Sequence, residues 1–310
     1  MTIPTTYPPA KIAVIINASA GSGCGSEWVE QLTGKFRACG MEIDITLAKS
    51  GAQTVDAAHR AVNQGATVIV AGGGDGTINA VASVVTGTGA ALGVLPLGTL
   101  NHFAKDLHIP LELDQAISNI ANGHIAKCDI GEINGKIFLN NSSLGLYPDI
   151  VREREKLQRR LGHGKWFAFF WATLAALRRY PFLNMRLTIE GIEHIRRAPF
   201  IFIGNNEYSM EGFNIGTRAR LDGGVLSLYL AQRRGRLGLL RLAVSSLFGK
   251  LRQESDFDAL TAREIRVETH RKRLRVSTDG EVSVMETPLL YRIRAAALPV
   301  IVPLNIDSTT

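Results

Sequence analysis

The chain has 310 residues, 45% of them hydrophobic, which suits one large domain or two modest domains with a substantial core. Its formal net charge of +7 favours anionic partners such as nucleotide phosphates, nucleic acid or an acidic membrane, although a solvated basic surface is an equally good explanation. The three cysteines, Cys24, Cys39 and Cys128, form no CxxC pair, which argues against a disulfide framework or a zinc site and suits a reducing cytosol.

No targeting or membrane-spanning segment is expected. The N-terminus lacks a basic stretch followed by an apolar one, as a secretory signal would require. The longest apolar run, from Trp166 to Leu177, is shorter than the roughly 20 residues that cross a bilayer.

The first part of the chain alternates short apolar strands with helical segments. The expected strands are 11–16, 42–48, 66–74 and 91–98, and the expected helices are 26–39, 55–65 and 77–85. Because the strands are continuously apolar, they predict a parallel sheet covered by helices on both faces.

After about residue 130 the pattern changes to short, turn-bounded strands that are often polar on one face. They are expected at 136–146, 184–192, 199–206, 225–231, 263–270, 273–281 and 288–294. This predicts an antiparallel second domain, most simply a sandwich. Two segments that mix arginines with large apolar residues, 151–180 and 237–252, are expected to be helical, and 297–303 could return to the first domain.

The motif GGGDGT, Gly72–Thr77, lies between an apolar strand and an apolar helix. Glycines allow the main chain to approach a ligand closely, and the N–H groups and dipole of a helix N-terminus favour anions, so the motif suits a polyphosphate. Asp75 would repel a bare phosphate, which implies an intervening cation, most simply Mg²⁺. The alternative is a tight strand-to-helix turn in which Asp75 only caps the helix.

Two further loops follow strands of the same sheet, Asn17–Gly23 and Gly98–Asn101. Ligands of open α/β sheets bind at the carboxyl ends of the strands, so the three loops are expected to line one crevice. Other phosphate-binding and catalytic motifs are missing: no GxxxxGK[ST], GxGxxG, GxSxG or HExxH occurs in a suitable place.

Taken with LGVLPLGTLNHFAKDL (92–107), GGGDGT resembles the diacylglycerol kinase catalytic-domain family, which includes bacterial lipid kinases and sphingosine kinases. IINASAGSG resembles the family's N-P-x-S-G loop with Ala18 in place of proline, RLDGGVLSLYL (220–230) its D-D-G segment with Leu221 in place of the first acid, and STDGEV (277–282) its D-G-E segment. The resemblance covers about residues 11–304. It implies an NAD kinase/phosphofructokinase-like α/β domain at 10–132, with 295–305 returning to it, and a β-rich lipid-substrate domain at 133–294.

The resemblance also implies a nucleotide site and two catalytic acids. Asp279 corresponds to the general base that takes the proton of the lipid hydroxyl, and Asp75 would act beside the phosphates. Without the resemblance, Asp279-Gly280 is simply a hairpin turn. The implied nucleotide contacts are Asn17, Ser19, Gly21, Thr46, Gly73, Gly74, Asp75, Gly76, Thr77, Asn79, Thr99 and Asn101.

A structural Mg²⁺ is implied at Asp222, with the carbonyl groups of Ala219 and Gly224 as further ligands; a turn aspartate before two glycines is the alternative. His102 stands where many relatives carry an acid of a carboxylate–water network, so this network must be rewired. Asp129 matches another member, whereas Thr217 and Leu221 depart from the family pattern.

The implied activity is ATP-dependent phosphorylation of a hydroxyl group on diacylglycerol or a related lipid, in phospholipid metabolism, by a cytoplasmic enzyme peripheral to the inner face of the membrane. Basic and aromatic residues in 152–171 and 233–252 could meet that membrane, or the aromatics could be core. Nucleic-acid binding is not expected, because no known binding fold accompanies the charge. The alternatives are a soluble-metabolite kinase resembling NAD kinase and a non-catalytic relative that binds nucleotide or lipid.

Overall fold

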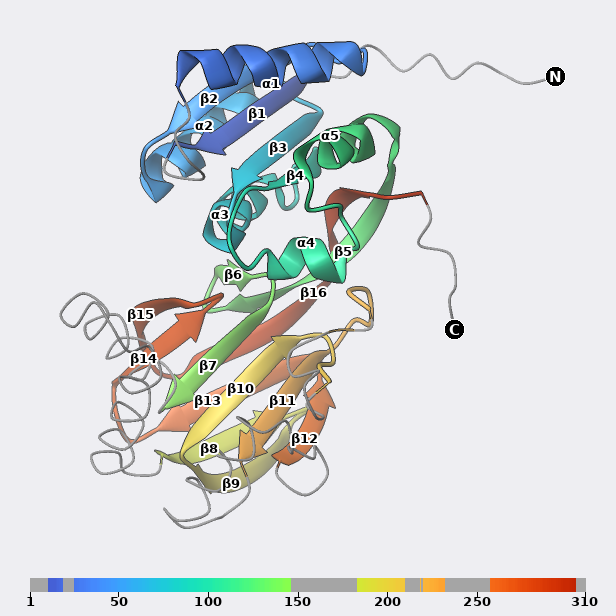
Figure 1. The fold of residues 1–310 in the computed structure, drawn as a ribbon. Helices are drawn as coiled ribbons and strands as arrows, with labels where there is room; N and C mark the ends of the chain where they lie inside the picture. The colour runs from blue at the N-terminus through green and yellow to red at the C-terminus, as the bar shows by residue number, and fades with distance from the viewer. Residues whose placement is uncertain are drawn as a thin grey trace, which may run out of the picture. The chain divides into compact units, whose positions relative to one another are not determined.

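The computed structural model describes residues 11–18, 25–145, 183–209, 218, 220–231 and 257–304. The chain divides into two compact units, Met1–Cys128 with Ala296–Thr310, and Asp129–Ala295. Figure 1 shows the α/β character of the first unit and the β-rich character of the second.

The N-terminal unit is built around a parallel sheet. Its strands lie in the order β2-β1-β3-β4, followed by the C-terminal end of β16, where Val300 pairs in parallel with Leu92. The strand bounds are β1 Ile12–Asn17, β2 Ile43–Ala48, β3 Val68–Gly73, β4 Ala91–Pro96 and β16 Leu289–Val302. All the β1, β3 and β4 pairings are parallel, so the carboxyl ends of these strands share one edge of the sheet.

Helices cover both faces of this sheet because its strands are apolar on both faces (Figure 1). Helices α1 (Ser26–Ala38) and α5 (Leu113–Asn122) share one core with β1, β3 and β4, in which Phe36 and Ile117 are fully buried. Helices α2 (Gly51–Asn63) and α3 (Asp75–Val85) pack against each other, and α4 (His102–Asp106) is a single short turn.

The C-terminal unit is a sandwich of two sheets (Figure 1). One sheet has the order β16-β13-β8-β9 and the other β12-β11-β10-β7-β14-β15, and their pairings are antiparallel. The strand bounds are β5 His124–Ile133, β6 Lys136–Phe138, β7 Asn141–Gly145, β8 Leu183–Ile189, β9 Ile192–Ala198, β10 Phe200–Asn205, β11 Leu226–Ala231, β12 Phe257–Ala262, β13 Glu264–Thr269, β14 Arg273–Thr278 and β15 Glu281–Glu286. The predicted fold class, a parallel α/β domain with a mainly antiparallel sandwich, is confirmed.

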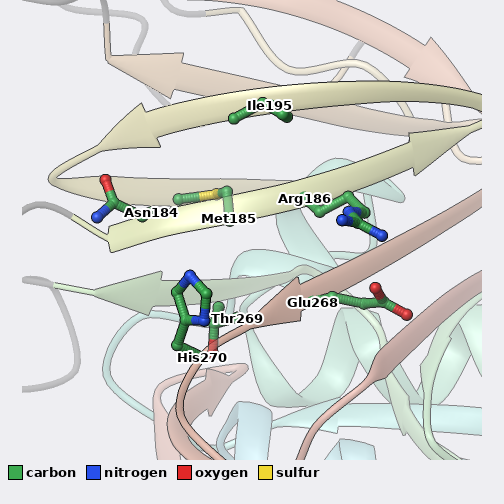
Figure 2. Close-up of a pocket in the computed structure, with 7 residues that line it drawn as sticks. All are labelled: Asn184, Met185, Arg186, Ile195, Glu268, Thr269 and His270. Atoms are coloured by element: carbon green, nitrogen blue, oxygen red, sulfur yellow. The ribbon is translucent and has the colours of Figure 1, made fainter.

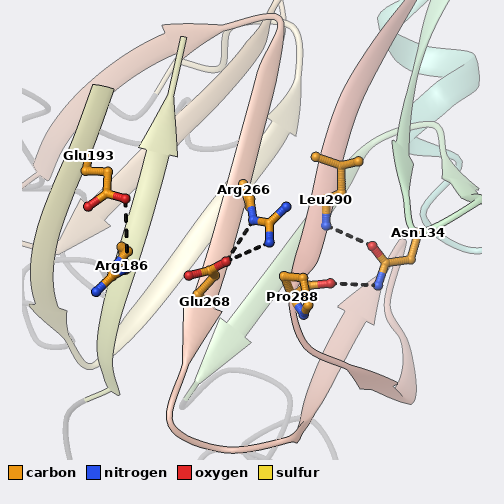
Figure 3. A network of polar contacts seen from close by, with 7 residues as sticks. All are labelled: Asn134, Arg186, Glu193, Arg266, Glu268, Pro288 and Leu290. Atoms are coloured by element: carbon orange, nitrogen blue, oxygen red, sulfur yellow. Dashed lines mark hydrogen bonds and ion pairs between the residues drawn. The ribbon is translucent and has the colours of Figure 1, made fainter. Parts of the chain in front are cut away.

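Side chains of both sheets form the sandwich core, whereas the outward-facing residues include charged side chains. On the outer face, Arg266 pairs with Glu268 at 2.8 Å and Arg186 approaches Glu193 at 3.8 Å (Figure 3). Asn134, in the turn between β5 and β6, donates to the carbonyl group of Pro288 and accepts from the N–H group of Leu290. The Arg266–Glu268 pair lies within β13, whereas the Arg186–Glu193 pair joins β8 to β9, and such exposed pairs add little stability.

Tyr291 is fully buried in the sandwich core, with its hydroxyl group 3.1 Å from the Ser142 hydroxyl. Burial raises the pKa of Tyr291 above its ordinary value of 10.0, and the Ser142 hydrogen bond only partly offsets this. The unfolded chain therefore loses this proton at a lower pH than the folded chain. The contribution to stability is complete below about pH 10 and is lost as the pH rises further.

We expect the free energy of unfolding to decrease above pH 10 more steeply in the wild type than in Tyr291→Phe. The additional slope of the wild type should approach about 1.4 kcal/mol per pH unit, the value for one proton. Urea denaturation between pH 8 and pH 11 measures both proteins. Parallel curves for the two proteins would contradict the assigned burial of this hydroxyl group.

Candidate active site

The carboxyl ends of β1, β3 and β4 bring together three loops that lie far apart in the sequence. Asn17, the last residue of β1, donates from its side-chain amide to the Thr77 hydroxyl at 3.2 Å. Thr77 lies in the first turn of α3, which begins at Asp75 directly after the glycines of β3. Helix α3 thus starts at this edge of the sheet, and its first main-chain bonds run from the N–H groups of Thr77 and Ile78 to the Gly74 carbonyl group at 2.9 and 3.1 Å. The N–H groups of Asp75 and Gly76 precede these bonds, as at any helix N-terminus.

Gly74 and Gly98 bring the loops after β3 and β4 into main-chain proximity. A Cβ atom on Gly98 would overlap the Cα atom of Gly74 and lie 2.8 Å from the Oδ1 atom of Asn101. A Cβ atom on Gly74 would instead meet its nearest neighbour, the Cα atom of Gly98, at an ordinary 3.5 Å. Gly98 is thus required by packing, whereas Gly74 has room for a methyl group.

The side chain of Asn101 organises the loop after β4. Asn101 is buried and has a left-handed main chain with φ 51°. Its amide donates to the carbonyl groups of Pro96 at 3.2 Å and Gly98 at 2.9 Å, and its Oδ1 atom accepts from the N–H group of Gly98. Two residues later, the N–H group of Phe103 donates to the carboxylate of Asp75 at 3.2 Å. These contacts tie α4 to the first residue of α3.

Other predicted nucleotide contacts lie around the same edge. Gly73 ends β3, Gly76 is exposed in the first turn of α3, Asn79 follows one turn later, and Thr99 is exposed in the loop after β4. Thr46 is half-buried in β2, opposite Ile15 of β1. Ser19 and Gly21 lie outside the described residues.

Asp279 belongs to the C-terminal unit, in the hairpin between β14 and β15. Both Asp279 and Gly280 have positive φ angles, 47° and 84°, as a two-residue hairpin turn of the primed kind requires. The hairpin expected from Asp-Gly is therefore present. Its aspartate also does more than turn the chain, because its carboxylate accepts hydrogen bonds from three consecutive main-chain N–H groups.

The N–H group of Leu139 donates to Oδ2 at 2.8 Å. The N–H groups of Asn140 and Asn141 both donate to Oδ1, at 2.8 and 3.0 Å. In return, the N–H group of Asp279 donates to the carbonyl group of Asn141 at 2.9 Å. Hydrogen bonds to a charged acceptor are stronger than those between neutral groups, and here they hold an anion at a fixed position on a half-buried surface.

Sequence reasoning missed the residues behind Asp279. Arg218 is buried with 6% exposure, and it donates to the side chain of Asn140 and to the carbonyl groups of Leu139 and Asn205. The adjacent Asn140 and Asn141, at the start of β7, could have drawn attention to this segment, but nothing in the sequence around Arg218 indicates a link to Asp279.

The residues predicted to bind a structural cation, Asp222 and Gly224, contact other protein groups. The exposed carboxylate of Asp222 pairs with Arg220 at 2.8 Å, and this hydrogen bond raises the pKa of the Arg220 guanidinium. The N–H group of Gly224 donates to the buried Asp129 at 2.6 Å. Ala219 lies outside the described residues. No group of three or more His, Cys, Asp or Glu side chains that could hold a metal occurs among the residues whose placement is described.

A pocket of about 310 Å³ lies in the C-terminal unit, between β8, β9 and the end of β13 (Figure 2). Figure 2 shows the imidazole of His270 beside the turn after β13, and Asn184 and Arg186 on β8. None of the residues predicted to bind nucleotide or metal lines this pocket. Its lining residues are Asn184, Met185, Arg186, Ile195, Glu268, Thr269 and His270.

The two basic and aromatic segments, 151–180 and 237–252, lie outside the described residues. Across the ranges whose structure is described, no helix has both the length and the apolar character needed to span a bilayer.

The comparison with protein families divides the chain as follows. Residues 11–133 match the diacylglycerol kinase catalytic domain, and residues 150–302 match the YegS C-terminal NAD kinase beta sandwich-like domain. Two relatives are named diacylglycerol kinase. One, from Staphylococcus carnosus, is 27% identical over 71% of this chain and 72% of its own length. The other, from Staphylococcus aureus, is 29% identical over 71% of this chain and 70% of its own length.

Solved structures share the fold across nearly the whole chain. A crystal structure of a Bacillus anthracis diacylglycerol kinase has a TM-score of 0.69 at 20% identity, covering 96% of this chain and 98% of its own. A second structure from the same organism has a TM-score of 0.76 at 21% identity, with the same coverage.

Asp279→Asn should reduce the melting temperature. An amide has one acceptor oxygen, and its NH₂ group would face a main-chain N–H group, so at least one donor loses its partner at a cost of about 1–3 kcal/mol. Glu281→Gln is the matched control, since Glu281 is exposed in the same hairpin and forms only a 3.6 Å surface pair with Lys136. Equal melting temperatures for the two variants would contradict the role of the three donors.

Proposed function

This chain belongs to the diacylglycerol kinase catalytic-domain family and is a lipid kinase, and on that premise we propose that it transfers the γ-phosphate of ATP to a hydroxyl group of diacylglycerol or a related membrane lipid. The observation that carries the proposal is the main-chain approach of Gly74 and Gly98 at the start of α3. Glycine loops leave the main chain accessible, and together with a helix N-terminus they offer N–H donors to a polyphosphate.

In this proposal the N-terminal unit binds the nucleotide. The N–H groups of Asp75 and Gly76, before the first main-chain bond of α3, would bond phosphate oxygens, with Asn17 and Thr77 held beside them by their mutual hydrogen bond. Phosphoryl transfer needs little covalent chemistry from a protein and depends mainly on positioning and on stabilising charge. Fixed main-chain dipoles supply such stabilisation without reorganising during the reaction.

Asp279 is the proposed acceptor of the proton that the lipid hydroxyl releases as it attacks the γ-phosphate. The three main-chain N–H groups support this role because they hold the carboxylate in one fixed position.

Mg²⁺ is proposed as the partner of the nucleotide phosphates, where it would neutralise charge beside Asp75. A second cation at Asp222 stays a prediction. Of the two carboxylates described there, Asp222 is paired with Arg220 and Asp129 accepts from the N–H group of Gly224, so the residues described do not by themselves fit a metal site and no step here depends on one.

Peripheral association with the cytoplasmic face of a membrane is proposed from the nature of the substrate, because a diacyl lipid does not leave the bilayer readily. The net charge of +7 would favour an anionic leaflet.

Gly74→Ala should weaken ATP binding by about tenfold or more, equivalent to ~1.4 kcal/mol, without unfolding the protein. The main chain of Gly74 is extended, with φ −86° and ψ −177°, and its surroundings have room for the new methyl group, which would then face the phosphates. Calorimetric titration with Mg·ATP and a thermal melt measure the two effects.

Gly34→Ala in α1 is the matched control, because a Cβ atom there meets nothing within 4 Å and the site is remote in the sequence. Gly98→Ala provides the contrast, since it should lower the melting temperature through overlap with Gly74. Unchanged ATP affinity in a folded Gly74→Ala protein would remove the main-chain cradle from the proposal.

The reaction itself is tested by offering labelled ATP with a total lipid extract, with purified diacylglycerol and with NAD, each with Mg²⁺ and with EDTA. We expect a labelled lipid that mass spectrometry identifies as a phosphate monoester, formed only when Mg²⁺ is present. A label on NAD would favour a soluble-metabolite kinase, and ATP binding without any labelled product would favour a non-catalytic relative.

A further inference from the structure

The position of the Asp279 carboxylate depends on one short piece of main chain. Its three donors, Leu139, Asn140 and Asn141, are consecutive, and the first two lie in the connection between β6 and β7. Residues in such a connection are not aligned by strand pairing on both sides. Other contacts must therefore fix the direction of their N–H groups.

Arg218 supplies several of these contacts. Its guanidinium donates to the carbonyl group of Leu139 at 2.8 Å, to the Asn140 side chain at 2.7 Å and to the carbonyl group of Asn205 at 3.1 Å. The guanidinium also lies over the ring of Tyr208, 5.2 Å from its centroid. These interactions are buried, so water competes little for the donors.

Asn205 reinforces the same segment. Its side-chain amide donates to the carbonyl groups of Leu139 at 2.9 Å and Asp129 at 2.8 Å, and its main-chain N–H group donates to the carbonyl group of Asn140 at 2.9 Å. Arg218 and Asn205 thus hold the segment 139–140 from its carbonyl side, while Asp279 receives its N–H groups.

The peptide unit between Leu139 and Asn140 connects the two sides. A trans peptide is planar, with its C=O and N–H groups pointing in opposite directions. Here the C=O group accepts from the Arg218 guanidinium and the N–H group donates to the Oδ1 atom of Asp279. A cation at the oxygen fixes the tilt of the plane and polarises it, which makes the N–H group a stronger donor.

We propose that Arg218 is a positioning residue for Asp279, acting through the Leu139–Asn140 peptide and the Asn140 side chain. The proposal rests on the proposed function, in which Asp279 accepts the substrate proton. Arg218 itself touches neither substrate nor nucleotide in this scheme. Its planar fork of donors reaches three acceptors at once, which the single ammonium group of lysine cannot match in the same directions.

Arg218→Lys and Arg218→Met are the test variants, with lysine retaining the charge and methionine only part of the volume. Both should lower kcat by on the order of tenfold or more, because small displacements of a catalytic group are costly, while the KM for ATP stays within about twofold. Amide hydrogen exchange in peptides covering residues 136–145 should be faster than in the wild type. Asn140→Ala, which removes one acceptor of Arg218, should change both readouts in the same direction.

Arg273→Met is the matched control. Arg273 belongs to the hairpin that carries Asp279, and its exposed guanidinium pairs with Glu286 at 3.0 Å. This variant should leave kcat and the exchange of 136–145 unchanged. If Arg218→Met does not fold, Arg218→Lys and Asn140→Ala still carry the test.

Two results would overturn the proposal: wild-type kcat in the folded Arg218→Lys and Asn140→Ala variants, or a reduced kcat with unchanged exchange at 136–145. A wild-type protein that phosphorylates no lipid would instead refute the proposed function. The exchange measurement would even then decide whether Arg218 orders the donors of Asp279.

Discussion

The hydrogen bonds from three consecutive main-chain N–H groups to the Asp279 carboxylate are the interaction on which the arrangement of the candidate catalytic residue in the C-terminal unit depends. They link the β14–β15 hairpin to the start of β7 and provide partners for main chain that strand pairing leaves without one. The acid expected to perform chemistry is therefore also a structural acceptor. The same three hydrogen bonds fix the position of the carboxylate and the main-chain path of residues 139–141.

The N-terminal unit uses main chain in a comparable way, but there the constraint is the absence of side chains. Gly98 must lack a Cβ atom because Gly74 occupies that space, and Asn101 holds the loop in place by bonding Pro96 and Gly98. Gly74 itself meets no such restriction. Packing therefore explains why Gly98 is a glycine and does not explain Gly74.

Much of the fold was predictable because burial on both faces leaves continuous apolar strands, and burial on one face leaves alternating ones. The misses have specific causes. Helix α2 begins at Gly51, earlier than expected, because Ser50 caps it by accepting from the N–H group of Gln53. Helix α5 was overlooked although Leu113, Ala116, Ile117 and Ile120 have helical spacing. Strand β9 is largely exposed, so its sequence carries no apolar alternation.

The sequence by itself determined the family, the two kinds of sheet, the strand-to-helix turn at Gly72–Thr77 and the hairpin at Asp279-Gly280, because each follows from local spacing or from main-chain conformations that few residues tolerate. Only the tertiary structure decided that Asn17 meets Thr77, that Gly98 packs on Gly74, and that Arg218 reaches the peptide whose N–H group faces Asp279. The Asn17–Thr77 and Arg218–Leu139 contacts join residues 60 and 79 positions apart, and the Gly98–Gly74 contact passes through main-chain atoms. The pattern of side chains along the sequence therefore does not predict these contacts.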